Sequence, residues 1–520
     1  MNRLDILSLM RGEGERTFFI DAPSDRAFTY ASFLDRALCM AARFKEAGVQ
    51  NQDRVVLFLP NAPEFACAYL ACLLLGAVAV PVNPALPSRD LDYIFAHARA
   101  TLLVYAAKTA SAIPVAAVSG VKRLRIVLHK DSECADNAPT WRMDDPGVGL
   151  ATVAAPSAGD LFSITFTSGT TNRPKGVPHR VEGLLASALA FNKSLGFDDN
   201  TRMYHVMPMS YMAGFLNTIL CPLVARGSVV SNGPFDARLG LDFWSAAARY
   251  EADTLWVVPS MLTSLLKLDR GDRGQVFCRE RVRAACIGTA PLPLALKIDF
   301  EKRYGVALHE SYGLSETLFL ASNSGAIPYK AGSVGKLLEG VELRLLGADG
   351  TDVAPTAEGE IHVKVPWMMA GYLDPETGLP DSSTSPAWFP SGDLGKIDGD
   401  GHLFITGRKK DLIIRGGANI SPRAIEEWIL EDRDVQQAAV VGVPHAFYGE
   451  DAVAFICIRQ KEETEAIQQR LLSSAREQLG AAFSPSRVIV VDELPVNTTG
   501  KVLKNRLREM WQAGEFGQPT

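Results

Sequence analysis

Hydrophobic and polar positions alternate along the first 400 residues with two different periods. Short apolar runs of strand length, such as 55–60, are followed by stretches with apolar residues at helical spacing, such as 64–77. Because strands that alternate with helices form parallel sheets covered by helices, this pattern predicts an α/β fold. The most apolar stretch, 69–82, is shorter than a membrane span and contains Gly76 and Pro81, so it predicts a buried helix that leads into a strand.

Three later apolar runs end in loops rich in Gly, Ser, Thr or Pro. They span residues 162–167, 283–288 and 306–311. Open parallel sheets bind ligands outside the carboxyl ends of their strands. The three loops are therefore predicted to be walls of one binding site.

The pattern changes near residue 332. Short strands with close turns between 332 and 407 predict a small β-barrel or sandwich. The residues that follow have a compact α+β pattern. These changes of pattern predict a domain boundary near Lys410, between residues 1–409 and 410–520.

Composition narrows the range of functions. A hydrophobic content of 47% and a charged content of 22% are typical of a soluble globular protein. The net charge of -6, with Lys and Arg scattered among acids, argues against a nucleic-acid partner. Eight cysteines without a CxxC pair, and an N-terminus without a basic head before an apolar run, favour free thiols in a reducing cytoplasm.

The loop 167–176 (TSGTTNRPKG) is suited to binding phosphate. Its glycines allow close approach of the backbone, its N–H groups and hydroxyls can donate to oxygens, and Lys175 adds positive charge. It is not a Walker loop, because the GxxxxGK[ST] order is missing. In isolation, a flexible polar turn explains it equally well.

Three other segments are ambiguous when each is taken alone. Glu316, in the sequence ESYGLSET, can hold Mg²⁺ or simply cap a helix. Asp393 can accept hydrogen bonds from ribose hydroxyls, and Arg408 can add donors. Lys501, which follows Gly500, can reach across a cleft, although most such lysines are solvated surface residues.

The acidic sequence DGDG at 398–401 suggests calcium at first sight. It lacks the spacing of an EF-hand loop and lies between two predicted strands. A hairpin turn is the better interpretation.

In this order, the four segments resemble the adenylate-forming superfamily of acyl-CoA synthetases, peptide-synthetase adenylation domains and beetle luciferases. The resemblance covers nearly the whole chain and rests on the phosphate loop 167–176, a YGxTE-like loop at 312–316, a TGD-like loop at 391–393, a GRxKD hinge at 407–411 and a PxxxxGK tail at 495–501. It implies a large N-terminal adenylation domain, residues 1–409, of two α/β sheets plus a small β-barrel. It also implies a small, mobile α+β C-terminal domain, residues 410–520, that swings about a hinge at Lys410.

The resemblance also assigns roles to residues. It implies that Lys175, Glu316 and Lys501 are catalytic and that Glu316 holds the metal. It places the ATP and AMP site at Thr167, Ser168, Gly169, Thr170, Thr171, Lys175, Gly288, Ala290, Pro291, Ser311, Tyr312, Gly313, Ser315, Asp393, Arg408 and Lys501. It places the acyl pocket at Tyr211, Met212, Gly214, Gly288 and Ser311, and the path of the thiol at Gly416 and Gly417.

The activity implied is that of an AMP-forming acyl-CoA synthetase that uses ATP, Mg²⁺ and coenzyme A. A carboxylate attacks ATP to give acyl-AMP and pyrophosphate, and the acyl group then passes to a thiol; Mg²⁺ and a lysine suit a step that brings two anions together. One alternative is a ligase that loads the phosphopantetheine of an acyl carrier protein. Others are a luciferase-like oxygenase and a non-catalytic relative. A monomer or homodimer without a transmembrane segment is expected.

The chain departs from the family pattern at Asn172, Tyr211, Glu310 and Ser311, where glycine, histidine, glutamine and glycine are usual. A serine at 311 narrows the acyl tunnel, and Glu310 is expected to repel an extended anionic group. These changes favour a short, medium or aromatic carboxylate over a very long fatty chain. An amino-acid substrate is not expected, because 209–211 holds no acid to pair with a buried ammonium.

Overall fold

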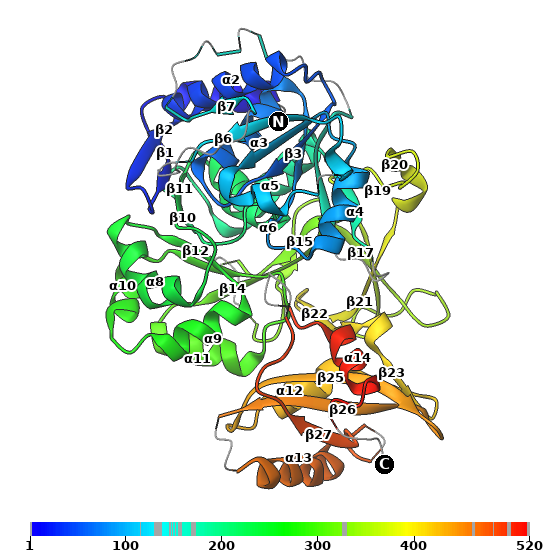
Figure 1. Ribbon diagram of the computed structural model, residues 1–520. Helices are drawn as coiled ribbons and strands as arrows, with labels where there is room; N and C mark the ends of the chain where they lie inside the picture. The colour runs from blue at the N-terminus through cyan, green and yellow to red at the C-terminus, as the bar shows by residue number, and fades with distance from the viewer. Residues whose placement is uncertain are drawn as a thin grey trace.

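The computed structural model describes residues 3–114, 116–128, 138–144, 147, 149–150, 152–153, 159–167, 173–324, 330–459, 463–481, 483–496 and 501–516. The chain forms a large N-terminal part and a smaller C-terminal part, which lies below it in orange and red in Figure 1. In the described part of the chain, no helix is both long and apolar enough to cross a membrane.

The first sheet of the N-terminal part runs in the order β16-β15-β14-β13-β12-β10-β11-β1-β2. Its strands are β1 (Thr17–Asp21), β2 (Arg26–Thr29), β10 (Arg202–His205), β11 (Ser228–Ser231), β12 (Thr254–Val257), β13 (Ala284–Ile287), β14 (Leu308–Leu314), β15 (Leu318–Ser322) and β16 (Lys336–Leu337). The six central strands β14, β13, β12, β10, β11 and β1 pair in parallel. The strands at the two ends, β2 on one side and β15 and β16 on the other, pair antiparallel.

The second sheet runs in the order β7-β6-β5-β3-β4-β8-β9. Its strands are β3 (Arg54–Phe58), β4 (Val78–Pro81), β5 (Leu102–Ala106), β6 (Lys122–Ile126), β7 (Thr140–Trp141), β8 (Leu161–Thr167) and β9 (Lys175–Arg180). Only its edge strand β9 runs antiparallel to its neighbour, β8.

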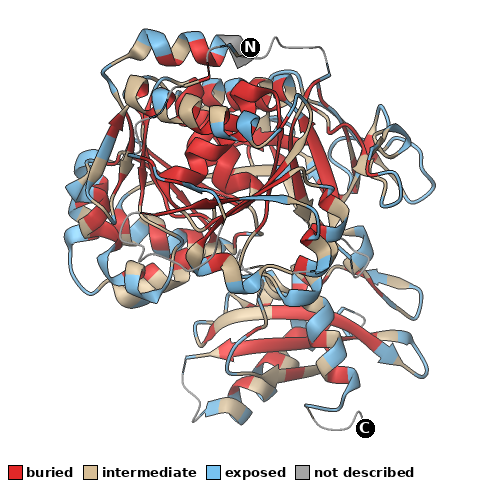
Figure 2. Ribbon diagram, turned by 45° about the horizontal axis from the view of Figure 1, so that its top comes forward, coloured by how far each residue is buried: buried red, intermediate tan, exposed pale blue. Residues whose placement is uncertain are grey.

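Helices pack against both sheets. They are α1 (Arg3–Glu13), α2 (Tyr30–Glu46), α3 (Pro63–Leu75), α4 (Ser88–Ala98), α5 (Val181–Leu195), α6 (Met212–Phe215), the π-helical turn η3 (Leu216–Leu220), α7 (Cys221–Val224), α8 (Ala237–Arg249), α9 (Pro259–Leu268), α10 (Arg273–Arg281) and α11 (Leu294–Tyr304), with 3-10 turns η1 (Ala107–Ala112) and η2 (Ala116–Val118). Every residue of α3 is buried, as expected of a helix that is apolar on all sides except at Glu64. The buried helices form the interior of the N-terminal part in Figure 2.

The helix-to-strand transition predicted at 69–82 is confirmed. Helix α3 ends at Leu75, Gly76 takes the left-handed conformation with φ 79°, and β4 begins at Val78. A left-handed residue after a helix is usually glycine, because a Cβ is strained there.

The region predicted to be a small β-barrel or sandwich is antiparallel β-structure. Its strands β17 (Glu342–Leu346), β18 (Gly359–Lys364), β21 (Phe389–Ile397) and β22 (Leu403–Arg408) pair in the order β17-β18-β21-β22, and β19 (Tyr372–Leu373) pairs with β20 (Pro380–Asp381), which leads into the turn η4 (Ser382–Thr384). Within residues 330–459, these strands form an open row and not a closed ring. Backbone hydrogen bonds between Leu403 and residues 334 and 335 join β22 to the chain that enters β16.

The short turn η5 (Lys409–Asp411) leads into the C-terminal part. This part contains β23 (Ile413–Arg415), β24 (Ala418–Ile420), α12 (Pro422–Ile429), β25 (Val435–His445), β26 (Gly449–Ile458), α13 (Thr464–Gln478), β27 (Arg487–Val490) and α14 (Lys504–Gln512). Apolar side chains on the two faces of its sheet form two clusters, one beneath α12 and α13 and one beneath α14. The α+β pattern predicted for this segment is confirmed.

Candidate active site

Loops from both large sheets meet the small antiparallel sheet. Lys175, at the start of β9, places its Nζ atom 4.6 Å from the ring centre of Tyr372 on β19. The Tyr372 hydroxyl donates a 2.6 Å hydrogen bond to Oε1 of Glu316, in the turn after β14. Of the three segments predicted to share one site, the chain beyond β8 and the chain beyond β14 are thus connected through Tyr372, and Gly288 beyond β13 lies against Ser311. They come from two sheets, because β8 lies in a different sheet from β13 and β14.

The phosphate loop is only partly described. Thr167 ends β8 and pairs with Lys175 across the two strands. Ser168, Gly169, Thr170 and Thr171 lie outside the described residues, as does Asn172.

Asp393 is a buried carboxylate at the centre of a group of polar side chains. It is 3% exposed, and Arg408, its cross-strand partner on β22, places Nε 2.9 Å from Oδ1. The Tyr312 hydroxyl donates to Oδ2 at 2.7 Å. Each carboxylate oxygen keeps a further lone pair, so Asp393 can also accept hydrogen bonds from a diol such as ribose.

Lys501 reaches the same group from the C-terminal part. An isolated β-bridge between Val496 and Val502 holds the ends of its loop together. Burial, together with the positive charges of Arg408 and Lys410, lowers the pKa of Lys501 to about 8, whereas Asp393 acts in the opposite direction. The ammonium thus lies in a cluster rich in positive charge, which suits a polyphosphate.

The carboxylate of Glu316 is held at one oxygen. Oε1 accepts the Tyr372 hydroxyl, and the backbone carbonyl accepts the amide of Met369 at 3.0 Å. Among the described residues, Oε2 has no hydrogen-bond donor. This carboxylate oxygen, on the residue that Tyr372 connects to Lys175, would fit a hard cation such as Mg²⁺ and could help to hold it.

The predicted acyl pocket is tight around Gly288 and Ser311. A Cβ added at Gly288 would lie 2.8 Å from Ser311 Oγ and 3.5 Å from Cζ2 of Trp256. Ala290 and Pro291 follow in the loop after β13, next to Thr289, which has a φ of 71°. Gly313 lies against the backbone of the next strand, because a Cβ there would be 2.2 Å from Leu318 O.

The expected repulsion by Glu310 is wrong. Side chains alternate along a strand, so Glu310 points to the face of β14 opposite to that of Ser311. There it accepts a 2.9 Å hydrogen bond from the buried ammonium of Lys297 on α11. Its charge is therefore paired behind the strand.

The turn at 208–214 carries Tyr211 and Met212. A Cβ at Gly214 would lie 1.9 Å from the carbonyl oxygen of Pro208, so only glycine fits. Burial, with a smaller contribution from the charge of Glu316, raises the pKa of Tyr211. Met212 is buried at the start of α6.

Gly416 and Gly417 form the turn between β23 and β24, both with positive φ. The Gly416 amide donates to the carbonyl of Tyr448 in the same part of the chain. A Cβ at Gly417 would meet no atom within 4 Å. Within the described residues, this turn does not contact the group around Asp393.

Three residues that contact the site were not predicted from the sequence. Tyr372 and His179 hold the loop of Ser315 and Glu316, and Asn61 binds the backbone of Met207 and Met209 before the Tyr211 turn. Their partners lie far away in the chain, so none of the three residues gave a local signal in the sequence.

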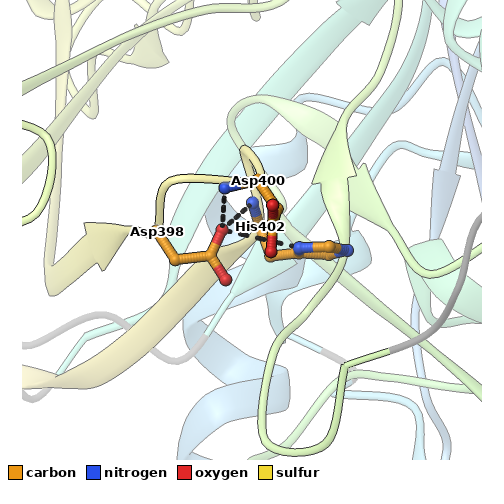
Figure 3. A group of neighbouring side chains, drawn as sticks. All are labelled: Asp398, Asp400 and His402. Atoms are coloured by element: carbon orange, nitrogen blue, oxygen red, sulfur yellow. Dashed lines mark hydrogen bonds and ion pairs between the residues drawn. The ribbon is translucent and has the colours of Figure 1, made fainter.

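The DGDG sequence is a hairpin turn between β21 and β22, as predicted. Asp398, Asp400 and His402 gather there (Figure 3), and Asp398 Oδ1 accepts the amides of the other two at 2.9 Å. Lys330 lies 2.5 Å from Asp398 Oδ2 and 3.4 Å from Asp400. Because a lysine already compensates these acids, the cluster is explained as a capped turn.

Comparison with known proteins identifies the family. The sequence model of the AMP-binding enzyme family matches residues 9–373, and that of the AMP-binding enzyme C-terminal domain matches residues 424–501. The chain belongs to the AMP-binding enzyme family. The predictions of the adenylate-forming superfamily, its two-part α/β fold and an AMP-forming acid–thiol ligase are confirmed.

This AMP-binding enzyme is similar to CoA ligases that are named for different acids. It is 30% identical to a sulfoacetate–CoA ligase of Cupriavidus necator over 95% of this chain and 94% of that protein. It is also 30% identical to a long-chain-fatty-acid–CoA ligase of Mycobacterium tuberculosis over 95% of each chain.

A solved relative is available in two states. The ATP-bound structure of MatB from Rhodopseudomonas palustris is 29% identical, with a TM-score of 0.85 and coverage of 98% of this chain and 99% of that chain. The apo structure of MatB has the same identity, covers 99% of both chains and has a TM-score of 0.74. Because the sequences compared are the same, the difference reflects shape, and this chain has the shape closer to the ATP-bound form.

Proposed function

We propose that this AMP-binding enzyme is an AMP-forming acyl-CoA synthetase that activates a small carboxylic acid with ATP and passes the acyl group to coenzyme A. The observation that carries the proposal is the buried carboxylate of Asp393, which Tyr312 and Arg408 hold, with Lys501 near it. A diol acceptor and a phosphate-binding lysine in one place match a nucleoside triphosphate.

Each charged residue has a role in the first half-reaction. Asp393 binds the ribose hydroxyls, Lys175 attracts the outer phosphates, and Lys501 stabilises the charge that develops at the α-phosphate. Glu316 would hold Mg²⁺ through its free oxygen, and the bound ion would supply positive charge that offsets the repulsion between carboxylate and ATP.

The second half-reaction requires the C-terminal part to turn. Lys501 and the turn of Gly416 and Gly417 belong to the same part of the chain, and only Lys501 is near Asp393. We place the hinge at Lys410, in the short turn η5, and assign the glycine turn to the path of the pantetheine thiol. Rotation of the C-terminal part would then move Lys501 away from Asp393 and bring the turn of Gly416 and Gly417 to the site.

The acid is proposed to be short, medium in length or aromatic. The 2.8 Å between a Cβ position at Gly288 and Ser311 Oγ supports a narrow pocket at this point. The free thiols of all described cysteines support a reducing, cytoplasmic location.

The test is pyrophosphate release with ATP and Mg²⁺ across short, long, aromatic and amino acids, with and without coenzyme A. One acid that gives turnover accelerated by coenzyme A supports the proposal. A slow burst that coenzyme A leaves unchanged would point to a carrier-protein ligase, and a strong preference for palmitate would contradict the narrow pocket.

A lysine variant connects the activity with this site. Lys501→Ala is expected to abolish acyl-AMP formation and to spare transfer from preformed acyl-AMP to coenzyme A. Lys396→Ala, at an exposed lysine of β21, serves as the control and should keep both steps. Equal loss of both steps in Lys501→Ala would contradict the role of a swinging lysine.

A further inference from the structure

The turn that carries Ser315 and Glu316 is strained and needs support. Leu318, at its end, has a φ of 53°, which is unfavourable for a bulky residue. The carbonyl of Leu318 also lies directly over Gly313, where a Cβ would be 2.2 Å away. A turn in this conformation persists only when neighbouring groups hold it.

His179 on β9 provides one of these contacts from the second sheet. Its side chain is fully buried, and Nε2 lies 2.6 Å from the carbonyl oxygen of Ser315. Lys175 and His179 share one face of the strand because side chains alternate. The same strand face thus meets the ring of Tyr372 at one end and the Ser315 carbonyl at the other.

The hydrogen bond fixes the tautomer of His179. A carbonyl oxygen only accepts, so Nε2 carries the proton and Nδ1 carries a lone pair. Nδ1 is buried and has no hydrogen-bond partner among the described residues. Burial also lowers the pKa of His179 to about 4, in keeping with a neutral ring at physiological pH.

We infer that His179 is a positioning residue, which holds the Ser315 carbonyl so that the Glu316 carboxylate faces the metal and the phosphates. The inference rests on the proposed function. Two other groups act on the same turn: Met369 binds the Glu316 carbonyl, and Tyr372 binds Oε1. His179 acts on the carbonyl of the preceding residue, a contact that neither Met369 nor Tyr372 makes.

Three substitutions separate this role from general damage to the fold. His179→Gln keeps an N–H donor at about the reach of Nε2, His179→Asn places its amide one methylene short, and His179→Leu has no donor. Loss of a group that orients a metal ligand typically costs about 10–100-fold in metal affinity or activity. The matched control is Ser163→Ala, because Ser163 pairs with His179 across β8 and β9 and its buried hydroxyl has no partner.

The experiment is a Mg²⁺ titration of pyrophosphate release, with a thermal melt of each variant. His179→Leu and His179→Asn are expected to raise the half-saturating Mg²⁺ concentration about 10–100-fold, while His179→Gln and Ser163→Ala stay close to wild type. If His179→Leu does not fold, His179→Gln and His179→Asn still test the inference, because both carry a side-chain amide and differ only in how far its N–H group reaches. Equal titrations for that pair would overturn the inference.

The proposed function and the role of His179 would be refuted by different results. A wild-type protein that releases no pyrophosphate with any acid would refute the proposed function. An active wild type whose Mg²⁺ titration is unchanged in all three His179 variants would refute only the role of His179.

Discussion

At the scale of single residues, the site depends on one buried carboxylate and on less buried charges around it that partly cancel. Asp393 is the negative centre, and Arg408, Lys410 and Lys501 lie around it with Asp411 as a second acid. Burial lowers the pKa of both lysines. A polyphosphate would supply the negative charge that this cluster lacks.

The pKa of Lys501 makes a prediction about pH. Its ammonium is the form that attracts phosphate, and this form is lost in the free enzyme as pH rises through about 8. Above that point, kcat/KM for ATP is expected to fall about tenfold per pH unit. Lys501→Arg keeps its charge and should shift the decline to higher pH, even if its rate is lower. Identical profiles for both proteins would contradict the assignment.

Glu64 makes a second prediction, which concerns stability. This α3 residue is 2% exposed, and burial raises its pKa to about 7. The folded state therefore binds its proton more tightly than the unfolded chain, whose carboxyl has a pKa of about 4.3. Stability should fall as pH rises between these two values and then stay constant.

Glu64→Gln should remove this dependence and stabilise the N-terminal part at pH 8 by on the order of 3 kcal/mol. The measurement is urea unfolding of both proteins at pH 5 and pH 8. Glu182→Gln, at an exposed acid of α5, is the control. If Glu64→Gln is no more stable than wild type at pH 8, ionisation of Glu64 does not lower the free energy of unfolding, and the prediction is wrong.

At the scale of elements, the local pattern of hydrophobic and polar residues was sufficient to predict many of the helices and strands. The runs predicted at 162–167, 283–288 and 306–311 became β8, β13 and β14. Helix α14 was not predicted, because only Leu507 and Trp511 among its residues are buried and its sequence is mostly polar. Strand order was not predictable either, because it depends on pairing between distant segments, and β8 joined the second sheet.

The same limit applies to the site. The resemblance led to Asp393, Arg408 and Lys501, which the structure brings together. Tyr372 and His179 were missed because their partners, Glu316 and Ser315, lie 56 and 136 residues away in the chain. Contacts of that separation leave no periodic signal in a single sequence.

The Tyr211 turn supplies a prediction at this scale. An alanine at Gly214 would place its Cβ 1.9 Å from Pro208 O, so the turn must move. A displacement of about 1 Å in a site can cost roughly 100-fold in rate. We expect Gly214→Ala to raise KM for the acid and lower kcat, as measured by pyrophosphate release.

The control for Gly214→Ala is Gly12→Ala in α1, where a Cβ meets no atom within 4 Å. That change should leave the rate unaltered and stabilise the helix by about 0.5–1 kcal/mol. Normal saturation by the acid in Gly214→Ala would mean that the turn does not shape the pocket.

At the scale of the whole molecule, the arrangement of the two parts matches the one proposed for the first half-reaction. The chain matches ATP-bound MatB more closely than apo MatB, and Lys501 lies near Asp393. On the outer surface, Lys267 of α9 donates a 2.8 Å hydrogen bond to Gln436 of β25. A rotation about Lys410 would separate these two side chains. Their contact therefore reports the arrangement of the two parts from a position outside the candidate active site.

A crosslink at this contact tests whether both half-reactions share one arrangement. Lys267→Cys and Gln436→Cys, joined by a short bis-maleimide, should hold the two parts as they are. The linked protein is expected to form acyl-AMP at close to the wild-type rate and to lose transfer from acyl-AMP to coenzyme A, because Gly416 and Gly417 can no longer reach the site. The single variant Lys267→Cys, treated in the same way, controls for reaction at native cysteines, most of which are buried. If the linked protein transfers the acyl group as fast as the unlinked one, the C-terminal part does not need to turn, and the thiol must enter the site past Lys501.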